Sequence, residues 1–340
     1  MIAVAAMLAV VATAMAVAQA PAPSAAQRLL DAAAPGSSVT VPPGTYPGGL
    51  RIAKPLTVNL KGVTLTGIVD RKGVILVDNT PGPVTIEEFE TTLAPNAHGN
   101  IAGLRVQGGG DVTLRRSRIA FAEMGILTGN EGTGKLTVEE SVIEEIGGGS
   151  LSHGIYFGVG DTLVVRDTIV RRGRRHGHLI KSRARKTVID RVQALALDGN
   201  SSRELEFPCG GDIAVTGSVV QKGPDSDNAE SIAVNVESAK ALGNAGNCGA
   251  NDGQATRFAF KGNWLIFDRA GKPPERQHAA GANEFGKWRA LPPDTPIEVS
   301  GNRIVGLKSW GEFPNLSAAN KMYADRAAAG LEPGEIPRLP

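Results

Sequence analysis

Two series of short apolar strands recur along the chain at one common spacing, and this repeat constrains the fold more than any other feature. The central residues of the first series are spaced by 24, 27, 24 and 26 positions: Thr113, Thr137, Val164, Val188 and Ala214. A second series follows at the same period, in segments 125–129, 154–158, 177–182, 204–208 and 231–235. A period of about 25 residues is typical of a solenoid in which each repeat forms one coil.

A parallel β-helix accommodates both series, because equivalent strands of successive coils pair into long parallel sheets. Inward side chains then stack as Val, Ile and Leu ladders, while outward positions stay free for polar groups. The alternative is a sandwich with evenly spaced strands, which would not repeat both series at one period. The 43 glycines and 4% aromatic residues also argue against a helical bundle.

The two ends of the chain differ from the repeats. Residues 1–20 are uncharged and apolar and end in Ala18-Gln19-Ala20, which predicts a secretory signal peptide; the alternative is a membrane anchor. Residues 21–36 are expected to contain a short amphipathic helix that caps the first coil of a β-helix domain over 37–314. Residues 315–340 are expected to form a C-terminal tail that is helical over 315–330. We therefore expect a monomeric, secreted or periplasmic protein without stable membrane insertion after cleavage.

The two cysteines, Cys209 and Cys248, are expected to pair. An even count in an exported chain favours a disulfide, and two buried free thiols are the alternative. This bridge would hold the loop around Cys248 beside the strand that ends at Cys209.

Positive charge is concentrated in one part of a nearly neutral chain. Nine Lys or Arg residues lie between Arg171 and Arg191, against one acid, whereas the whole chain has a net charge of +2. Three of the five histidines lie nearby: His153, His176 and His178. The upstream arginines fall on a turn, where they are expected to be solvated or to guide a polyanion.

Hydrophobic alternation predicts which side chains of the second series face outward. Placing Ile155, Ile180 and Leu205 inward stacks Tyr156, Lys181 and Glu206 outward on neighbouring coils, about 4.8 Å apart. Gly158, Arg183 and Pro208 would form the next outward row. A slip of one residue would invert this register.

The side chains gathered in this way suit catalysis on an anionic sugar. Lys181 is predicted to be a general base or charge clamp, with His178 as the competing acid or base. Arg183 suits bidentate binding of a carboxylate, and Tyr156 suits sugar stacking or proton donation. Each also has a structural interpretation: a Lys181–Glu206 salt bridge, a hydrogen-bonded turn histidine, or a solvated arginine. The predicted substrate-binding residues are His153, His176, Arg174, Arg175 and Asn235.

Glu204 and Glu206 are expected to lie on one face of their strand. Two outward carboxylates could bind Ca²⁺ through oxygen ligands, or serve as the acid and base of a glycosidase. Calcium is therefore a candidate cofactor for these carboxylates.

The entry segment SSVTVPPGTYPGGLRI, followed by these coils, resembles the pectate-lyase-like superfamily of secreted right-handed parallel β-helices. The stretch HLIKSRARKTVIDRV is similar to one in the group that includes alginate lyases and chondroitinase B. In that group the lysine of a Lys-Ser pair is the general base, and the resemblance carries this role to Lys181. An arginine that acts on the leaving side one coil later in that group has no counterpart in the segment ELEFPC here.

Together these features predict a polysaccharide lyase that cleaves a uronic-acid-containing anionic polysaccharide by β-elimination. The alternatives are a glycoside hydrolase and a non-catalytic glycan-binding β-helix on the same scaffold. No phosphate-binding loop, dinucleotide fingerprint or HExxH zinc motif occurs. An exported location and few aromatic residues near the basic run argue against nucleic acid as a partner.

Overall fold

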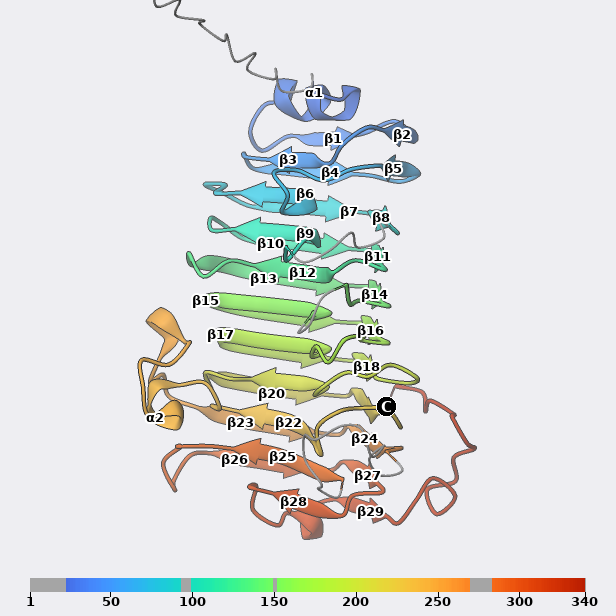
Figure 1. Ribbon diagram of the computed structural model, residues 1–340, viewed down its shortest axis with the longest axis vertical. Coiled ribbons are helices and arrows are strands. Elements are labelled where there is room, and N and C mark those ends of the chain that lie inside the picture. Colours follow the sequence, from blue (N-terminus) through green and yellow to red (C-terminus); the bar gives the residue numbers. More distant parts are fainter. Residues whose placement is uncertain (1–22, 93–98, 149–151, 270–282, 340) are drawn as a thin grey trace, which may run out of the picture.

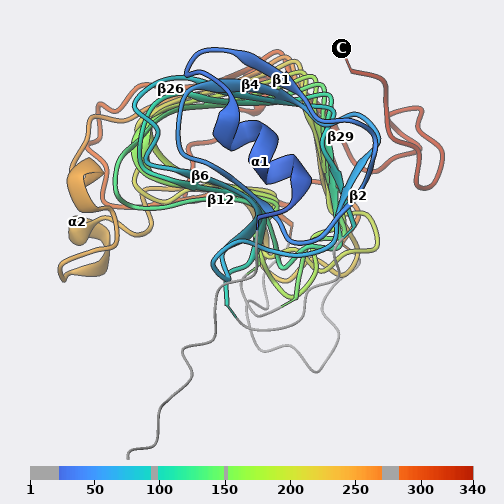
Figure 2. The ribbon, with the colours of Figure 1, turned by 90° about the horizontal axis from the view of Figure 1, so that it is seen from above.

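The computed structural model describes residues 23–92, 99–148, 152–269 and 283–339. Within these ranges the chain forms a parallel β-helix whose coils stack along one axis (Figure 1). Viewed along this axis, successive coils superimpose around one interior (Figure 2). The predicted signal peptide, residues 1–20, lies outside the described residues. None of the helices in the described part is long and apolar enough to cross a membrane.

Three faces run along the stack. Face A contains the first half of β15 (Ile155–Arg166) and of β17 (Ile180–Asp190), with β3 (Leu50–Ile52), β6 (Gly73–Asp78), β9 (Ala102–Gln107), β12 (Met124–Thr128), β19 (Leu205–Phe207), β22 (Glu230–Val234), β25 (Glu284–Trp288) and β28 (Ser309–Gly311). Face B contains the second halves of β15 and β17, with β1 (Ser38–Thr40), β4 (Leu56–Asn59), β7 (Val84–Glu87), β10 (Val112–Arg115), β13 (Thr133–Glu139), β20 (Asp212–Thr216), β23 (Arg257–Lys261) and β26 (Ile297–Ser300).

Face C is a separate sheet made of β8 (Glu90–Thr91), β11 (Arg118–Ala120), β14 (Val142–Glu144), β16 (Ile169–Arg171), β18 (Gln193–Leu195), β21 (Val219–Lys222), β24 (Trp264–Phe267), β27 (Arg303–Val305) and β29 (Lys321–Tyr323). Two short strands, β2 (Gly44–Tyr46) and β5 (Val63–Leu65), pair with each other near the N-terminal end. The two predicted strand series correspond to faces A and B, whereas the strands of face C were not predicted.

The predicted stacking of the two strand series is confirmed. On face A the residues paired coil by coil are all fully buried: Ile126, Ile155, Ile180, Leu205 and Ile232. On face B, Thr113, Thr137, Val164, Val188 and Ala214 are in register on the outward side of the strands. The residues that follow them form the buried ladder: Leu114, Val138, Val165, Ile189 and Val215. Because one strand face is buried in every coil, a one-residue slip would expose the whole ladder, and this fixes the register.

The turn from face B to face C is nearly identical in successive coils. One residue adopts a left-handed conformation, as in Arg116 (φ 49°), Glu140 (φ 50°), Asp167 (φ 47°) and Arg191 (φ 50°). The following side chain accepts the backbone N–H of the equivalent turn in the preceding coil, in the order Ser117, Ser141, Thr168, then Ser218, Asn263, Asn302 and Asn320. This ladder satisfies backbone donors that the tight turns would otherwise leave buried and unpaired.

The N-terminal capping helix is confirmed. Helix α1 (Ala25–Ala32) starts at Ser24, whose side chain accepts the N–H of Gln27. Its inward side chains Ala26 and Leu30 are buried against the end of the core. The helix therefore covers apolar surface that an open first coil would expose (Figure 2).

The expected C-terminal helix is wrong. Residues 315–339 contain only a short 3₁₀ turn (Ser317–Ala319) and β29, which extends face C by pairing with β27. Asn320 explains the difference, because it is the last member of the turn ladder and donates to the carbonyl of Val299. Beyond β29 the chain runs along the outside of face C, where Leu331 joins an outward apolar cluster with Val219, Ile266 and Val305.

Candidate functional site

The predicted outward column on face A is present. Tyr156 pairs in register with Lys181, and Lys181 pairs with Glu206, on the strands β15, β17 and β19. Lys181 Nζ lies 5.9 Å from the centre of the Tyr156 ring and 3.6 Å from Glu206 Oε2. The predicted Lys181–Glu206 contact is therefore part of a larger cluster.

The prediction that Arg183 stacks beside Gly158 in the next outward row is wrong. The pairing of β15 with β17 shifts between Phe157 and Val159, so that Arg183 pairs with Val159 instead of Gly158. This irregularity is stabilised by the preceding coil, because Thr128 accepts the N–H of Gly158 and Asn130 accepts that of Val159. The Arg183 guanidinium lies 5.1 Å from the centre of the Tyr156 ring.

Glu237 completes this group and was missed by the sequence analysis. Its Oε1 atom accepts a hydrogen bond of 2.6 Å from Lys181 Nζ, and its Oε2 atom accepts two from the Arg183 guanidinium. Burial alone would raise the pKa of Glu237, but the charges of Lys181 and Arg183 outweigh it and lower the pKa. Glu237 is therefore ionised, and one carboxylate bridges two cations.

The loop that carries Glu237 leaves the stack between β22 and β23 and contains the short helix α2 (Ala239–Leu242). The predicted disulfide between Cys209 and Cys248 is confirmed and anchors this loop. Asn251 adds hydrogen bonds to the carbonyls of Gly160 (2.8 Å) and Arg183 (2.7 Å). The cysteine spacing was thus the one sequence signal for a loop beside the site, although it did not identify Glu237.

Two buried histidines support the column from one side. Their rings stack at 5.0 Å, and His153 also stacks on Tyr156 at 5.3 Å. Each Nδ1 atom accepts a backbone N–H: His153 from His178, and His178 from Arg203. Because Nδ1 is an acceptor in both rings, a neutral histidine here carries its proton on Nε2. Burial lowers the pKa of His178 and holds the pKa of His153 well below its ordinary value.

His178 is fully engaged by the protein. Its Nδ1 accepts from the backbone and its Nε2 contacts the carboxylate of Glu206. Burial alone would raise the pKa of Glu206, but His178, Lys181 and Arg203 hold it well below its ordinary value. His178 therefore has no ring nitrogen left for substrate, which favours a positioning role over the predicted acid–base role.

Glu204 and Glu206 do not share a face, contrary to expectation. Glu204 precedes β19, is completely buried, and lies 3.5 Å from the equally buried Lys222 Nζ. It also accepts a 2.8 Å hydrogen bond from Ser231, and burial raises its pKa. The two carboxylates have different partners, so the glycosidase pairing does not form. Among the described residues no group of three or more His, Cys, Asp or Glu side chains is arranged to hold a metal ion, and calcium binding stays a prediction.

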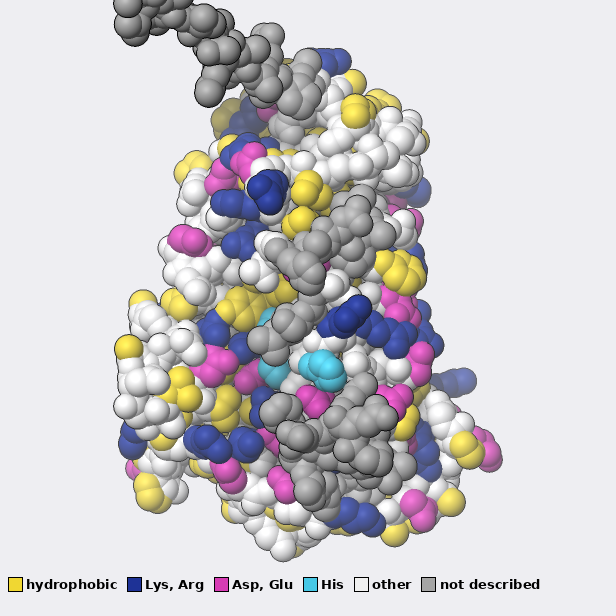
Figure 3. Space-filling model, in the orientation of Figure 1, with side chains coloured by type: hydrophobic (Ala, Val, Ile, Leu, Met, Phe, Trp, Pro, Cys, Tyr) yellow, Lys and Arg dark blue, Asp and Glu magenta, His cyan; other side chains and the backbone are white. Residues whose placement is uncertain are grey.

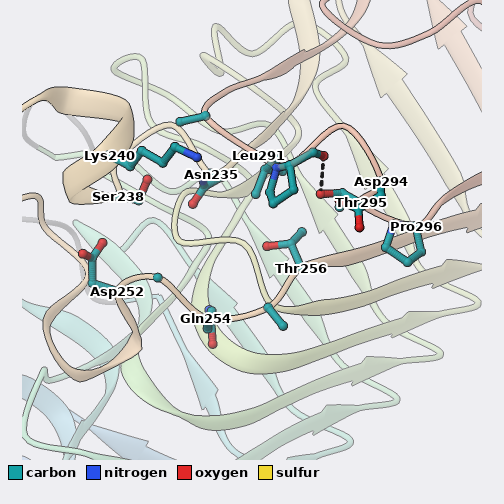
Figure 4. A pocket seen from close by; sticks show the side chains of 14 residues that line it. Asn235, Ser238, Lys240, Asp252, Gln254, Thr256, Leu291, Asp294, Thr295 and Pro296 are labelled. Carbon is teal, nitrogen blue, oxygen red and sulfur yellow. Dashed lines mark hydrogen bonds between the residues drawn. The ribbon is translucent and has the colours of Figure 1, made fainter.

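Other predicted binding residues lie away from the column. Arg174 pairs with Glu145 at 2.8 Å at the end of face C, Arg175 is exposed, and His176 lies 3.5 Å from Asp227. Asn235 donates a hydrogen bond to the carbonyl of Arg289 and lines a separate pocket of about 350 Å³. Figure 4 shows this pocket between the Glu237 loop and the Leu291–Pro296 segment, with polar side chains such as Ser238, Asp252 and Thr256 around it.

The column opens into a groove of about 490 Å³ on face A. Its lining includes His153, Tyr156, Lys181, Arg183 and Glu237, and it extends across the preceding coils to Arg105. Figure 3 shows the histidines in the middle of the molecule, with both basic (Lys, Arg) and acidic (Asp, Glu) side chains around them. An open groove along stacked coils suits an elongated ligand better than a compact one.

Comparison with known proteins gives only distant structural likenesses. No protein-family model and no curated protein matches the chain. An alginate lyase from Paenibacillus sp. str. FPU-7 aligns with 14% identity and a TM-score of 0.38, covering 88% of this chain and 94% of that one. The mannuronan C-5 epimerase AlgE6 A-module of Azotobacter vinelandii aligns with 14% identity and a TM-score of 0.35, covering 88% and 93%. At these scores neither protein carries an argument about this one, and the β-helix assignment rests on the strand pairing described above.

Proposed function

We propose that the protein is a lyase that cleaves a uronate-containing polysaccharide by β-elimination. The observation that carries this proposal is the carboxylate of Glu237, which Lys181 and Arg183 bind together at the groove. Two cations that hold one carboxylate in this way would hold the carboxylate of a uronate sugar equally well. The substrate would displace Glu237, which belongs to a loop outside the coil stack.

The same clamp supports the chemistry. In β-elimination the C5–H bond breaks, a double bond forms between C4 and C5, and the C4–O4 bond breaks with its electron pair on O4. Negative charge develops on the sugar carboxylate when the C5 proton leaves, and fixed cations at that carboxylate stabilise the transition state. Lys181 and Arg183 would supply this stabilisation.

Tyr156 is the group best placed to move the proton. Its ring lies against both cations of the clamp and stacks on His153. Nearby positive charge stabilises a phenolate, which can accept the C5 proton and return it to O4 when both lie on one face of the sugar. Lys181, predicted as the base, lies 2.6 Å from the carboxylate of Glu237 and 3.6 Å from that of Glu206, so both acids already hold its Nζ atom. This arrangement supports a clamp role for Lys181.

One assay tests the proposal. Purified protein is incubated with polygalacturonate, polymannuronate, polyguluronate and sulfate-free chondroitin, with and without Ca²⁺, while absorbance of unsaturated uronates and new reducing ends are followed together. The proposal predicts both signals on at least one polymer, and loss of both in Tyr156→Phe. New reducing ends without absorbance would indicate hydrolysis, and the absence of both signals on every polymer would contradict lyase activity.

A further inference from the structure

Arg105 differs from the other cations of the groove because nothing in the described part of the chain binds it. It lies on β9, lines the groove, and is only partly exposed. Its Nε atom is buried and has no hydrogen-bond partner. Lys181 and Arg183, in contrast, share the carboxylate of Glu237.

An unpaired, partly buried guanidinium has an energetic cost. Removing a charged donor from water without a partner is unfavourable, and arginine does not escape this cost by losing its proton. The exposed acid Glu131 lines the same groove, and its charge partly offsets the burial that lowers the pKa of Arg105, but it forms no hydrogen bond or ion pair with Arg105 within the described residues. An anionic ligand at this position would supply the missing partner and offset the cost.

Arg105 lies in line with the candidate catalytic column. The strand register joins Arg105 to Leu127, Leu127 to Tyr156, and Tyr156 to Lys181 on successive coils. At about 4.8 Å per coil, Arg105 and Lys181 are about 14 Å apart along the axis. Two cationic positions are thus separated by the length of the groove.

The surface between them is apolar. Ala102, Met124 and Leu127 form a small cluster against which Tyr156 packs. Apolar and aromatic side chains of this kind suit the C–H faces of pyranose rings, while the cations at each end suit carboxylates.

We propose that Arg105 is a second carboxylate-binding position, so that the groove selects a polymer with uronates at several places along its length. This inference rests on the proposed function for the ligand class, but it makes a separate statement about binding. A glycan with a single uronate among neutral sugars would reach either Lys181 and Arg183 or Arg105, whereas a polyuronate would reach both.

The test is binding of a length series of oligogalacturonates and oligomannuronates by calorimetry, in a Tyr156→Phe background that leaves the ligand intact. Arg105→Gln removes the charge without breaking an ion pair of the described chain, so the melting temperature of the variant should be unchanged or higher. Lys135→Gln is the matched control, because Lys135 is exposed on face B and has no ion pair in the described chain. We expect Arg105→Gln to lower the affinity for long oligomers about tenfold and the affinity for the shortest oligomers little. Lys135→Gln should change neither affinity.

Equal affinity of Arg105→Gln and its parent for every length would overturn the inference, even if the protein is a lyase. An equal loss for short and long oligomers would also overturn it, because a second position should matter only for ligands that reach it. If the protein has no lyase activity but binds long oligouronates through Arg105, the inference stands and the proposed function fails.

Discussion

The basic stretch between Arg171 and Arg191 contains two groups of cations with different surroundings. At the end of face C, Arg171, Arg172 and Arg174 are each paired with carboxylates of the neighbouring coils. On face A, Lys181 and Arg183 share one carboxylate, Glu237, from a loop outside the stack. The two groups are adjacent in sequence but belong to different faces of the β-helix.

This difference distinguishes cations that stabilise the fold from cations that a ligand could bind. The carboxylates that pair with the turn arginines, such as Glu144 and Glu145, belong to the coil ladder itself and cannot leave without disrupting it. Glu237 belongs to a loop outside the repeat, and we propose that an anionic ligand displaces its side chain. The density of Lys and Arg in a sequence therefore indicates little about binding until the location of each counter-charge is known.

The largest expected effect concerns the groove cations. Lys181→Ala or Arg183→Ala should lower kcat/KM for a cleaved polyuronate about 100-fold or more, because each removes a charge that stabilises the transition state. Lys181→Arg keeps the charge but cannot act as a neutral base at ordinary pH. Steady-state kinetics should show partial activity for Lys181→Arg if Lys181 is a clamp. Activity as low as that of Lys181→Ala would instead support Lys181 as the base.

The buried ion pair between Glu230 and Arg203 on face A should affect how the stability of the protein depends on pH. Burial alone would raise the pKa of Glu230, but Arg203 and Lys287 lower it to about 2 from 4.5. Because the folded-state pKa is the lower one, the stabilisation is complete above pH 4.5 and is lost as the pH falls from there towards 2. The contribution of the ionised Glu230 to the free energy of unfolding at neutral pH is about 3 kcal/mol.

Glu230→Gln should therefore reduce the free energy of unfolding at neutral pH and flatten its decline in acid, as measured by urea denaturation at a series of pH values. Glu298→Gln is the matched control, because Glu298 forms an exposed pair with Lys261 on face B. Such exposed pairs contribute little. Parallel acid profiles for wild type and Glu230→Gln would contradict the assignment.

A smaller effect is expected when the counter-charge of the clamp is neutralised. Glu237→Gln keeps the shape of the side chain but no longer competes with a substrate carboxylate. We expect KM for a polyuronate to fall roughly fivefold, and the melting temperature in the absence of ligand to fall as well, because Lys181 and Arg183 lose the carboxylate that they share. A higher KM would mean that Glu237 orients the clamp or contacts the substrate instead of competing with it.

The smallest effect is expected at the turn. Arg172→Gln removes a charge as Arg183→Ala does, but Arg172 faces Glu145 and Asp198 at the surface. Kinetics on the same polymer should be unchanged, because a surface ion pair carries little energy and is screened by salt. A loss comparable with that of Arg183→Ala would remove the distinction between the two groups.

The sequence could predict the part of the site that obeys the repeat. Tyr156, Lys181 and Glu206 stack because hydrophobic alternation fixes the register of their strands. The position of Arg183 could not be predicted, because the shift at Phe157–Val159 depends on Thr128 and Asn130 in the preceding coil. Such hydrogen bonds between neighbouring coils have no recognisable pattern in the local sequence.

The other differences also arise where the chain departs from the repeat. Glu237 lies in an excursion of irregular length, and only the disulfide signalled where that loop would return. Glu204 lies just outside β19, so strand alternation did not apply to it. The C-terminal segment looks helical in composition, but Asn320 continues a ladder of turn side chains that becomes visible only when the coils are aligned.

The central claim is that Lys181 and Arg183 form a carboxylate-binding clamp, and one comparison tests it most directly. Calorimetry would measure the affinity of the protein for an oligouronate and for the same oligosaccharide with its carboxylates reduced to alcohols. We expect the acidic oligosaccharide to bind, and the reduced one to bind with an affinity at least about tenfold lower. Equal affinity for the two would contradict it.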